Sequence, residues 1–234
     1  MGLIDNGNLC GTIVTAWSYD RMVMEEGSMP LDTFHNLPEG KRSSITGVLL
    51  EEFGGTPYNE VSVNRIVQKA GISKGSFYQY FEDKKDCYMY LVHRALAEKT
   101  AFHRSLTVPG EMGLFPRLRW ILEQSLEFQF SSPLLSRVLY RALKDQLPFQ
   151  DEILQVVREG SRSYFSGEVT AAIARGELRE DVDPDLAVFM LSTLFNELGD
   201  YMLQRFGITE EDLAEQGGRV FAEDDTMQLL QDAV

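Results

Sequence analysis

Two very short helical segments meet at Gly71 in the first half of the chain. Ser62 is a good N-cap for the first segment, whose apolar residues fall on one face. Gly71 ends this segment, because glycine takes the left-handed conformation without a Cβ penalty. Ser73 is the next N-cap, and a second helix is expected over residues 75–81. Helices this short have little core of their own, and their spacing is that of a helix-turn-helix, whose second helix enters the major groove of DNA.

The expected second helix has two different faces. Phe77 and Phe81 are four residues apart, so they share one side and are expected to face the protein core. The opposite side carries hydrogen-bond donors and aromatic groups, namely Lys74, Ser76, Gln79 and Tyr80, with Tyr78 at the edge. On an arbitrary helix such a face is simply solvated. On the second helix of a helix-turn-helix it is the surface offered to DNA.

The rest of the chain is also expected to be helical. A helix that starts at Lys41 has an apolar face and breaks at residues 54–57, and Asp83 caps the helix that follows the helix-turn-helix. Asp183 and Pro184 form a strong helix start. Later helices are expected over residues 116–131, 134–146, 151–175, 184–206 and 210–221, with a short terminal piece. No strand alternation occurs, and no repeat of roughly 20–50 residues, so the expected fold class is all-α.

Residues 1–40 show only weak periodicity, and they are expected to form a loosely ordered extension. Glu25, Glu26 and Gly27 can be encoded by a purine-rich string that resembles a bacterial ribosome-binding site, a few bases before the codon for Met29. Translation from Met29 is therefore an alternative to a genuine acidic arm. The intact mass of the natively expressed protein distinguishes the two.

The net charge of −14 disfavours nucleic-acid binding until it is divided by segment. Residues 41–105 carry a net charge of +3, whereas residues 1–40 carry −5 and residues 106–234 carry −12. Contact with phosphate depends on local charge, so the acidic total is no objection. The local excess is mild, and charge alone contributes little to the interpretation.

Several other classes of protein lack support in the sequence. The apolar runs are shorter than the roughly 18 residues that span a bilayer, and no basic region precedes the first of them, so neither a membrane helix nor a secretory signal is expected. Cys10 and Cys87 suggest no disulfide framework, and a reducing cytoplasm is the simplest location. His35, His93 and His103 lack metal-ligand spacing, and there is no P-loop, GxSxG or dinucleotide motif. We therefore expect no enzyme, no metal site and no cofactor.

A longer stretch around Gly71 resembles a known family. The sequence from Ile66 to Phe81, IVQKAGISKGSFYQYF, is similar to the DNA-binding motif of the tetracycline-repressor (TetR) family, and residues 82–86 resemble the start of that family's next helix. The match covers about residues 41–91, with the turn glycine, cap serine and aromatic pair in register. The resemblance implies an N-terminal three-helix DNA-binding domain and a C-terminal helical domain that binds a ligand and dimerises.

The resemblance also implies roles for individual residues. Contacts to the DNA backbone fall on the start of the first helix and on two tyrosines and a lysine, whereas Lys74 and Gln79 are the candidates for reading guanine and adenine edges. Gly75 lets the helix approach closely, since a Cβ there could meet the DNA. Many family members carry His in place of Tyr80, which leaves the docking geometry open. The expected DNA-binding residues are Ser62, Val63, Asn64, Ser73, Lys74, Gly75, Ser76, Tyr78, Gln79, Tyr80 and Lys84.

The two long helices expected over residues 151–175 and 184–206 are candidates for a dimer interface. Both carry apolar stripes, and small residues in the first allow close helix approach. One helix-turn-helix reads few base pairs, so such proteins usually bind DNA as two-fold dimers. The alternative is that one or both stripes pack only inside the monomer.

Aromatic and methionine side chains are plentiful in the C-terminal half, and the resemblance implies a small effector bound between its helices. Arginines in this half could meet an anionic effector, although surface ion pairs are the commoner role. Core packing also explains any single aromatic residue. The candidate pocket residues are Trp120, Phe128, Tyr140, Tyr164 and Met190.

The expected organisation is an extension (residues 1–40), a DNA-binding domain (41–92) and an effector-binding and dimerisation domain (93–234). The expected protein is a ligand-responsive repressor that binds a palindromic DNA operator as a homodimer, with no membrane partner. The alternative is a DNA-binding protein of the same kind that acts constitutively or through a protein partner, without sensing a small molecule. Repression rather than activation comes from the family and not from any residue.

Overall fold

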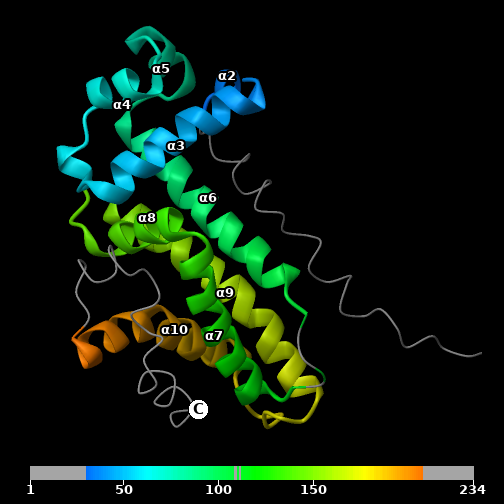
Figure 1. The fold of residues 1–234 in the computed structure, drawn as a ribbon. Coiled ribbons are helices and arrows are strands. Elements are labelled where there is room, and N and C mark those ends of the chain that lie inside the picture. Colours follow the sequence, from blue (N-terminus) through cyan, green and yellow to red (C-terminus); the bar gives the residue numbers. More distant parts are fainter. Residues whose placement is uncertain (1–29, 108–109, 111, 208–234) are drawn as a thin grey trace, which may run out of the picture.

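The described part of the chain is helical and contains no strand. The computed structural model describes residues 30–107, 110 and 112–207. Figure 1 shows α3, α4 and α5 at one end of the molecule, with the longer helices extending away from them, so the expected all-α fold is confirmed. The elements are α2 (Asp32–His35), α3 (Glu39–Gly55), the 3₁₀ turn η2 (Tyr58–Glu60), α4 (Val63–Ala70), α5 (Lys74–Tyr80), α6 (Lys84–Ser105), α7 (Leu114–Ser131), α8 (Pro133–Lys144), α9 (Gln150–Ala174) and α10 (Pro184–Phe206).

The expected caps and turn of the two short helices are present. The Ser62 hydroxyl accepts a hydrogen bond from the N–H of Arg65 at 3.3 Å, and the Ser73 hydroxyl accepts one from the N–H of Ser76 at 3.0 Å. Gly71 has a φ of 62°, the left-handed conformation expected at the end of α4. These local contacts fix where each helix begins and ends.

The other helices follow the predicted segments closely, and α10 coincides with its prediction. Asp83 caps α6 by accepting from the N–H of Asp86 at 2.8 Å, and Asp183 caps α10 by accepting from the N–H of Leu186 at 3.1 Å. Residues 1–29, with the alternative start at Met29, lie outside the described residues, as do the helix expected over residues 210–221 and the terminal piece.

The short helix α2 corrects the interpretation of the N-terminal region. Phe34 is 0% exposed, and its ring lies 6.0 Å from that of Tyr80 and 4.8 Å from that of Phe81. The N–H of Leu31 also donates to the Tyr80 carbonyl at 3.0 Å. The expectation of a loose extension is therefore wrong for residues 30–40. Weak periodicity concealed one aromatic residue that completes a distant core.

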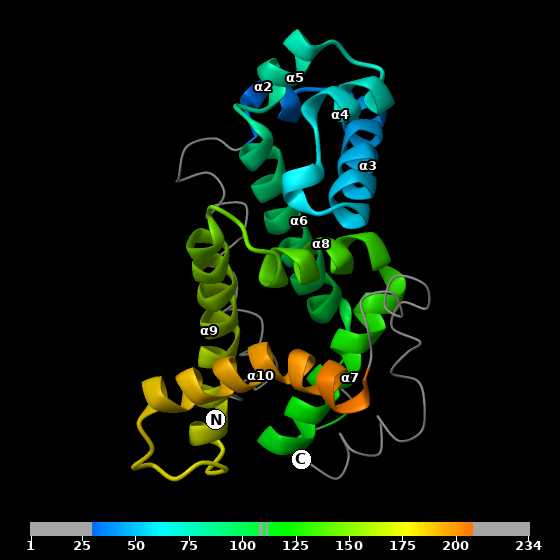
Figure 2. The same ribbon diagram turned by 90° about the vertical axis from the view of Figure 1, so that its left-hand side faces the viewer.

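One hydrophobic core crosses the boundary that the sequence suggested near residue 92. It contains Ile66 and Phe77 of the two short helices together with Val138 of α8 and Phe149, the residue before α9. Helix α6 runs unbroken through the expected boundary, and α8 packs against both α3 and α6 (Figure 2). The end that carries α4 and α5 therefore shares its core with the region that follows it.

A second, smaller core lies between α7, α9 and α10. Leu118, Phe165 and Val188 belong to it, and the Phe165 and Phe195 rings are 4.7 Å apart across the α9–α10 contact. Among the described helices, none combines the length and apolar character needed to cross a membrane.

Candidate nucleic-acid interface

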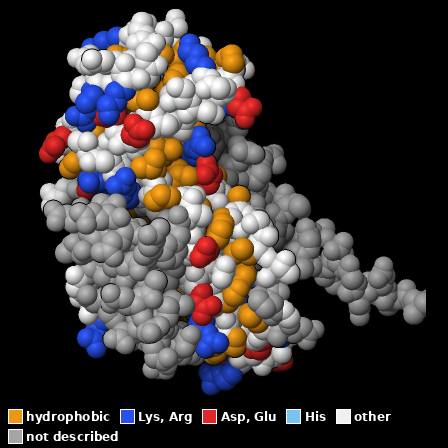
Figure 3. Space-filling view, in the orientation of Figure 1, with side chains coloured by type: hydrophobic (Ala, Val, Ile, Leu, Met, Phe, Trp, Pro, Cys, Tyr) orange, Lys and Arg blue, Asp and Glu red, His pale blue; other side chains and the backbone are white. Residues whose placement is uncertain are grey.

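The outward face of α5 carries three of the predicted DNA-contacting side chains. Lys74 and Gln79 are exposed, and Tyr78 is 48% exposed. Phe77 and Phe81 are fully buried, as predicted, so the other side of the helix is fixed to the core. Figure 1 shows α5 at the tip of the molecule, and Figure 3 shows Lys and Arg side chains on the visible face of this end, with acidic ones among them. A helix fixed in this way can enter a groove without moving the core behind it.

Tyr80 does not lie on this outward face. Its side chain is only 4% exposed, its ring packs against Phe34, and the Lys41 ammonium lies 5.8 Å from its ring centroid. The prediction of an outward Tyr80 is wrong, because α2 covers the side of α5 that helical spacing alone leaves open. Extensive contact between Tyr80 and a phosphate would require α2 to move away.

The first turn of α4 combines exposed polar side chains with free backbone donors. Ser62 and Asn64 are exposed, whereas Val63 packs partly against the core. The first N–H groups of a helix have no intrahelical partner, and they carry the positive end of the helix dipole. This end is therefore chemically suited to a phosphate, and the predicted contact there stays a prediction.

Gly75 has no requirement inside the protein for the absence of a side chain. A Cβ at this position would meet only the Ser73 hydroxyl oxygen, at an ordinary contact distance of 3.7 Å. The Ser73 and Ser76 hydroxyls hydrogen-bond to each other at 2.9 Å at the same end of α5. Glycine within a helix costs about 0.5–1 kcal/mol relative to alanine. Packing within the described fold thus gives no reason for the glycine.

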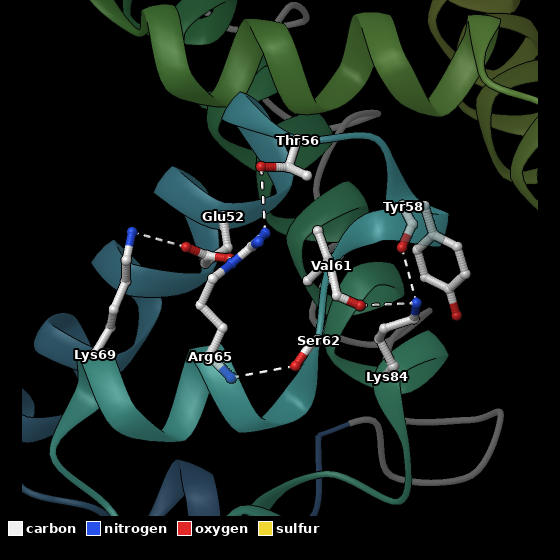
Figure 4. Close-up of polar contacts among 8 residues, drawn as sticks. All are labelled: Glu52, Thr56, Tyr58, Val61, Ser62, Arg65, Lys69 and Lys84. Carbon is white, nitrogen blue, oxygen red and sulfur yellow. Dashed lines mark hydrogen bonds and ion pairs between the residues drawn. The ribbon is translucent and has the colours of Figure 1, made fainter.

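A buried carboxylate ties α4 to α3. Glu52 is 3% exposed, and it pairs with the Lys69 ammonium at 2.8 Å and with the Arg65 guanidinium, which also donates to the Thr56 hydroxyl (Figure 4). Burial raises the pKa of Glu52, but the hydrogen bonds and charges of Lys69 and Arg65 outweigh it and lower the pKa overall. Glu52 was not among the predicted residues, because nothing in the apolar face of α3 shows that an acidic neighbour points at α4.

Lys84 is held among the residues that lead into α4. Its ammonium donates to the carbonyls of Tyr58 and Val61 at 2.8 and 3.0 Å, and it lies 4.2 Å from the centroid of the Tyr58 ring (Figure 4). Burial lowers the pKa of Lys84. The side chain thereby fixes the segment that leads into α4. A phosphate contact by Lys84, as predicted, would have to be shared with these carbonyls.

Three of the predicted effector residues lie among α6, α7 and α9. Phe128 is buried, with its ring 5.5 Å from that of Phe102 in α6. Trp120 and Tyr164 both pack against the smaller core, and the Tyr164 ring lies 6.4 Å from that of His103. A fourth candidate, Tyr140, is partly buried on α8.

Met190 lies on the outer face of α10 and not in this region. It is 62% exposed, because α10 turns Val188 and Phe195 toward the smaller core instead. The prediction of Met190 as a pocket residue is therefore wrong for this fold. Met190 belongs to an outward apolar stripe on α10, which comprises Leu186, Phe189, Met190, Leu194 and Tyr201.

Two polar side chains of α6 were missed by the sequence analysis as binding candidates. Lys99 and His103 follow the buried Leu91 and Ala95 at four-residue intervals, and both are partly buried on the same side of the helix. A lysine in register with buried apolar residues is the signal that could have revealed them. Burial lowers the pKa of Lys99, and burial together with the nearby Lys99 charge lowers the pKa of His103 to about 4.

Two protein-family profiles match the chain. The profile described as "Bacterial regulatory proteins, tetR family" matches residues 45–91, and the one described as "Tetracyclin repressor-like, C-terminal domain" matches residues 112–228. Together they cover both ends of the architecture described above. No match was found among curated proteins.

Solved structures give the same fold. A TetR family transcriptional regulator from Chloroflexus aurantiacus is 44% identical, with a TM-score of 0.63 over 88% of this chain and 94% of that chain. Bacillus subtilis FadR, solved in complex with stearoyl-CoA, is 18% identical, with a TM-score of 0.59 over 82% of this chain and 98% of that chain. Salmonella enterica GusR is 16% identical, with a TM-score of 0.60 over 84% of this chain and 94% of that chain.

Proposed function

Because this chain belongs to the TetR family of transcriptional regulators, we propose that it is a ligand-responsive repressor that binds a palindromic operator as a homodimer. The observation that carries the proposal is the outward face of α5, where Lys74, Tyr78 and Gln79 project from a helix whose opposite face is buried. Repression follows from occupancy, since a protein bound across a promoter blocks the polymerase.

The exposed side chains divide into two roles at the DNA. Lys74 suits the O6 and N7 atoms of guanine, and Gln79 suits the N6 and N7 atoms of adenine, so these two read sequence. Tyr78 and the first turn of α4 contact phosphates, which sets register and affinity without reading sequence. The capping contacts of Ser62 and Ser73 fix the first turn of each helix, where these contacts are proposed.

The outward apolar stripe on α10 supports the dimer. Its five large side chains are 55–62% exposed on one face of the helix, and exposed apolar side chains gathered in this way mark an interaction site. In a two-fold dimer the same stripe on each subunit packs against the other. The stripe predicted on α9 is used differently, because Ile153 is buried in the core shared with the DNA-binding end.

The region among α6, α7 and α9 is the proposed effector site. FadR, of the same fold, was solved with stearoyl-CoA, which supports a small-molecule site in this chain. An effector that prefers a state with a different spacing between the two recognition helices, roughly 34–36 Å in the DNA-bound dimer, lowers the affinity for DNA. By linkage, DNA must weaken effector binding by the same factor.

The test starts from operator sites selected from a randomised DNA library with the wild-type protein. Tyr78→Phe is expected to weaken binding to every selected site, by about 0.5–1.5 kcal/mol for one hydrogen bond. Gln79→Ala is expected to remove discrimination at one base position, worth about 1–3 kcal/mol. Binding titrations over single-base variants of the site measure both effects.

The control is Gln146→Ala, which removes the same side chain from an exposed position beyond α8. It should change neither affinity nor base preference. Unchanged relative affinities in Gln79→Ala would show that this residue does not read a base. Failure to select any enriched site would contradict the proposed function itself.

A further inference from the structure

An unpaired lysine lies in the C-terminal half of α6. Lys99 is partly buried, and burial is the cause of its lowered pKa. Within the described residues, no carboxylate forms an ion pair with it, whereas Arg94, five residues earlier, pairs with Glu98 at 2.7 Å. Removing a charge from water without a partner is costly. The described residues therefore supply no counter-ion for the ammonium of Lys99.

His103, one turn after Lys99, has an unmatched polar atom of its own. The Ser125 hydroxyl donates to the Ile121 carbonyl at 2.9 Å, so it accepts from Nε2 of His103 at 3.3 Å. Nδ1 is then the unprotonated nitrogen of a neutral imidazole. It is buried and has no hydrogen-bond partner among the described residues. Such orphaned acceptors are rare in folded proteins and call for an explanation.

The surroundings of His103, which lies within range of the Lys99 charge, are largely aromatic. The His103 ring lies 5.9 Å from the ring of Phe102 and 6.4 Å from that of Tyr164, and Phe102 lies 5.5 Å from Phe128. These side chains come from α6, α7 and α9, the region of the proposed effector site. A cation and an unmatched acceptor set among aromatic rings are complementary to an acid with an apolar body.

We propose that the effector is an amphipathic acid whose anionic group, a carboxylate or a phosphate, pairs with the ammonium of Lys99 while its apolar body lies against Phe102, Phe128 and Tyr164. This inference rests on the proposed function and names the class of its ligand. The anion supplies the counter-ion of Lys99, because its deprotonated oxygens accept from the ammonium. Where the group keeps a proton, as a monoanionic phosphate does, its O–H donates to the unprotonated Nδ1 of His103.

The same reasoning predicts an unusual effect on the free protein. An unpaired buried charge destabilises a fold, and replacing it with an apolar side chain of similar size is often neutral or stabilising. Lys99→Met should therefore leave the melting temperature of the ligand-free protein unchanged or raise it. A marked loss of stability would show that Lys99 serves the fold, and it would contradict the proposal.

The binding test compares decanoate, decyl phosphate and decan-1-ol by isothermal titration of the full chain. We expect at least one of the two anions to bind more tightly than the alcohol, by about ten- to a hundredfold, the range for a hydrogen bond to a charged group. Lys99→Met should abolish this preference and still bind decan-1-ol, and Lys99→Arg should restore part of it. The control Arg119→Gln removes an exposed cation of α7 and should bind like the wild type.

The two anionic probes distinguish a carboxylate ligand from a phosphate ligand. The proposal is overturned if neither anion binds, or if the preference for an anion persists in Lys99→Met. DNA titrations in the presence of the probes separate it from the proposed function. An anion that binds through Lys99 without lowering DNA affinity supports the site but contradicts effector-controlled release. If decan-1-ol alone releases the DNA, and does so equally from Lys99→Met, the result supports effector-controlled release but contradicts the anion site at Lys99.

Discussion

Two tyrosines of α5 differ in their exposure to solvent because of what packs beside each of them. Tyr78 is 48% exposed, whereas Tyr80, two positions later, is 4% exposed. Helical spacing alone places Tyr80 on the polar side, and the ring of Phe34 in α2 removes it from solvent. Tyr78 is therefore the tyrosine of α5 best placed to reach a phosphate in the described fold.

Gly75 permits an experiment that separates folding from DNA binding. Gly75→Ala should raise the free energy of unfolding by about 0.5–1 kcal/mol, because the helix accepts the methyl group and alanine loses less backbone entropy. The same substitution should reduce DNA affinity, because the added methyl group meets the DNA. Denaturant titration and DNA binding measure the two effects.

Gly47→Ala in α3 is the matched control, since a Cβ there meets nothing within 4 Å and is accepted by the fold like one at Gly75. It should stabilise the protein without affecting DNA affinity. Unchanged DNA binding in Gly75→Ala would rule out close approach as the reason for the glycine.

At the scale of helices, the buried carboxylate of Glu52 positions α4 relative to α3. Its partners Arg65 and Lys69 lie on α4, whose N-terminus is capped by Ser62 (Figure 4). Helix α4 braces the recognition helix α5, so the orientation of α5 depends on this link. Lys84 adds a second link through the carbonyls of the segment that leads into α4.

Glu52→Gln should lower the free energy of unfolding by about 1–2 kcal/mol, less than for a fully buried pair because Arg65 and Lys69 are 41% and 49% exposed. The folded-state pKa of Glu52 is below its model-compound value of 4.5. Its stabilisation is therefore present at pH 7 and is lost as the pH falls through the lowered pKa. Thermal unfolding across this range should show the difference between wild type and variant vanish at acid pH.

The exposed neighbour Glu51 provides the control, and Glu51→Gln should unfold like the wild type. DNA affinity should fall in Glu52→Gln for all sequences alike, since the link sets orientation and reads no base. A stability difference that persists unchanged at acid pH would contradict the role of the carboxylate charge.

At the scale of the whole molecule, the DNA-binding end and the region after it behave as one packed body. Phe149 lies 5.1 Å from the ring of Tyr58 and 6.0 Å from that of Tyr88. The Arg141 guanidinium of α8 donates to the Gly54 carbonyl at the end of α3, at 3.2 Å. A shift of α8 or of the start of α9 is thus transmitted to α3 by direct contact.

Phe149→Ala should destabilise the whole protein by about 3–5 kcal/mol, the usual cost of removing a buried phenylalanine. Because both regions share the core, unfolding should remain a single transition at a lower temperature in calorimetry. Phe115→Ala removes the same side chain from a largely exposed position on α7 and should have little effect. If calorimetry shows two separate transitions, and Phe149→Ala shifts only the one at higher temperature, the shared core is contradicted.

The α10 stripe leads to a prediction about assembly. Leu194→Glu places a charge on an exposed side chain, so the subunit should still fold, but the dimer should dissociate and operator affinity should fall steeply. Sedimentation velocity measures the mass of the complex, and Gln146→Glu is a control for added charge at an exposed position away from α10. A Leu194→Glu protein that remains dimeric would place the interface elsewhere.

The sequence alone determined the helices, their caps and the family. The caps at Ser62 and Ser73 and the left-handed Gly71 depend on atoms within a few residues, and the inward Phe77 depends only on helical spacing. Such short-range signals can be read without knowing the fold, and so the all-α architecture and the position of the helix-turn-helix were predictable.

Only the tertiary structure decided which face of each helix meets another. The burial of Tyr80 depends on Phe34, and the ion pairs of Glu52 depend on how α3 crosses α4. Met190 faces outward because α10 turns another side to α9, and Lys99 stands unpaired because no carboxylate of the described residues approaches it. These outcomes come from contacts between residues far apart in the chain, and neither periodicity nor spacing encodes such contacts.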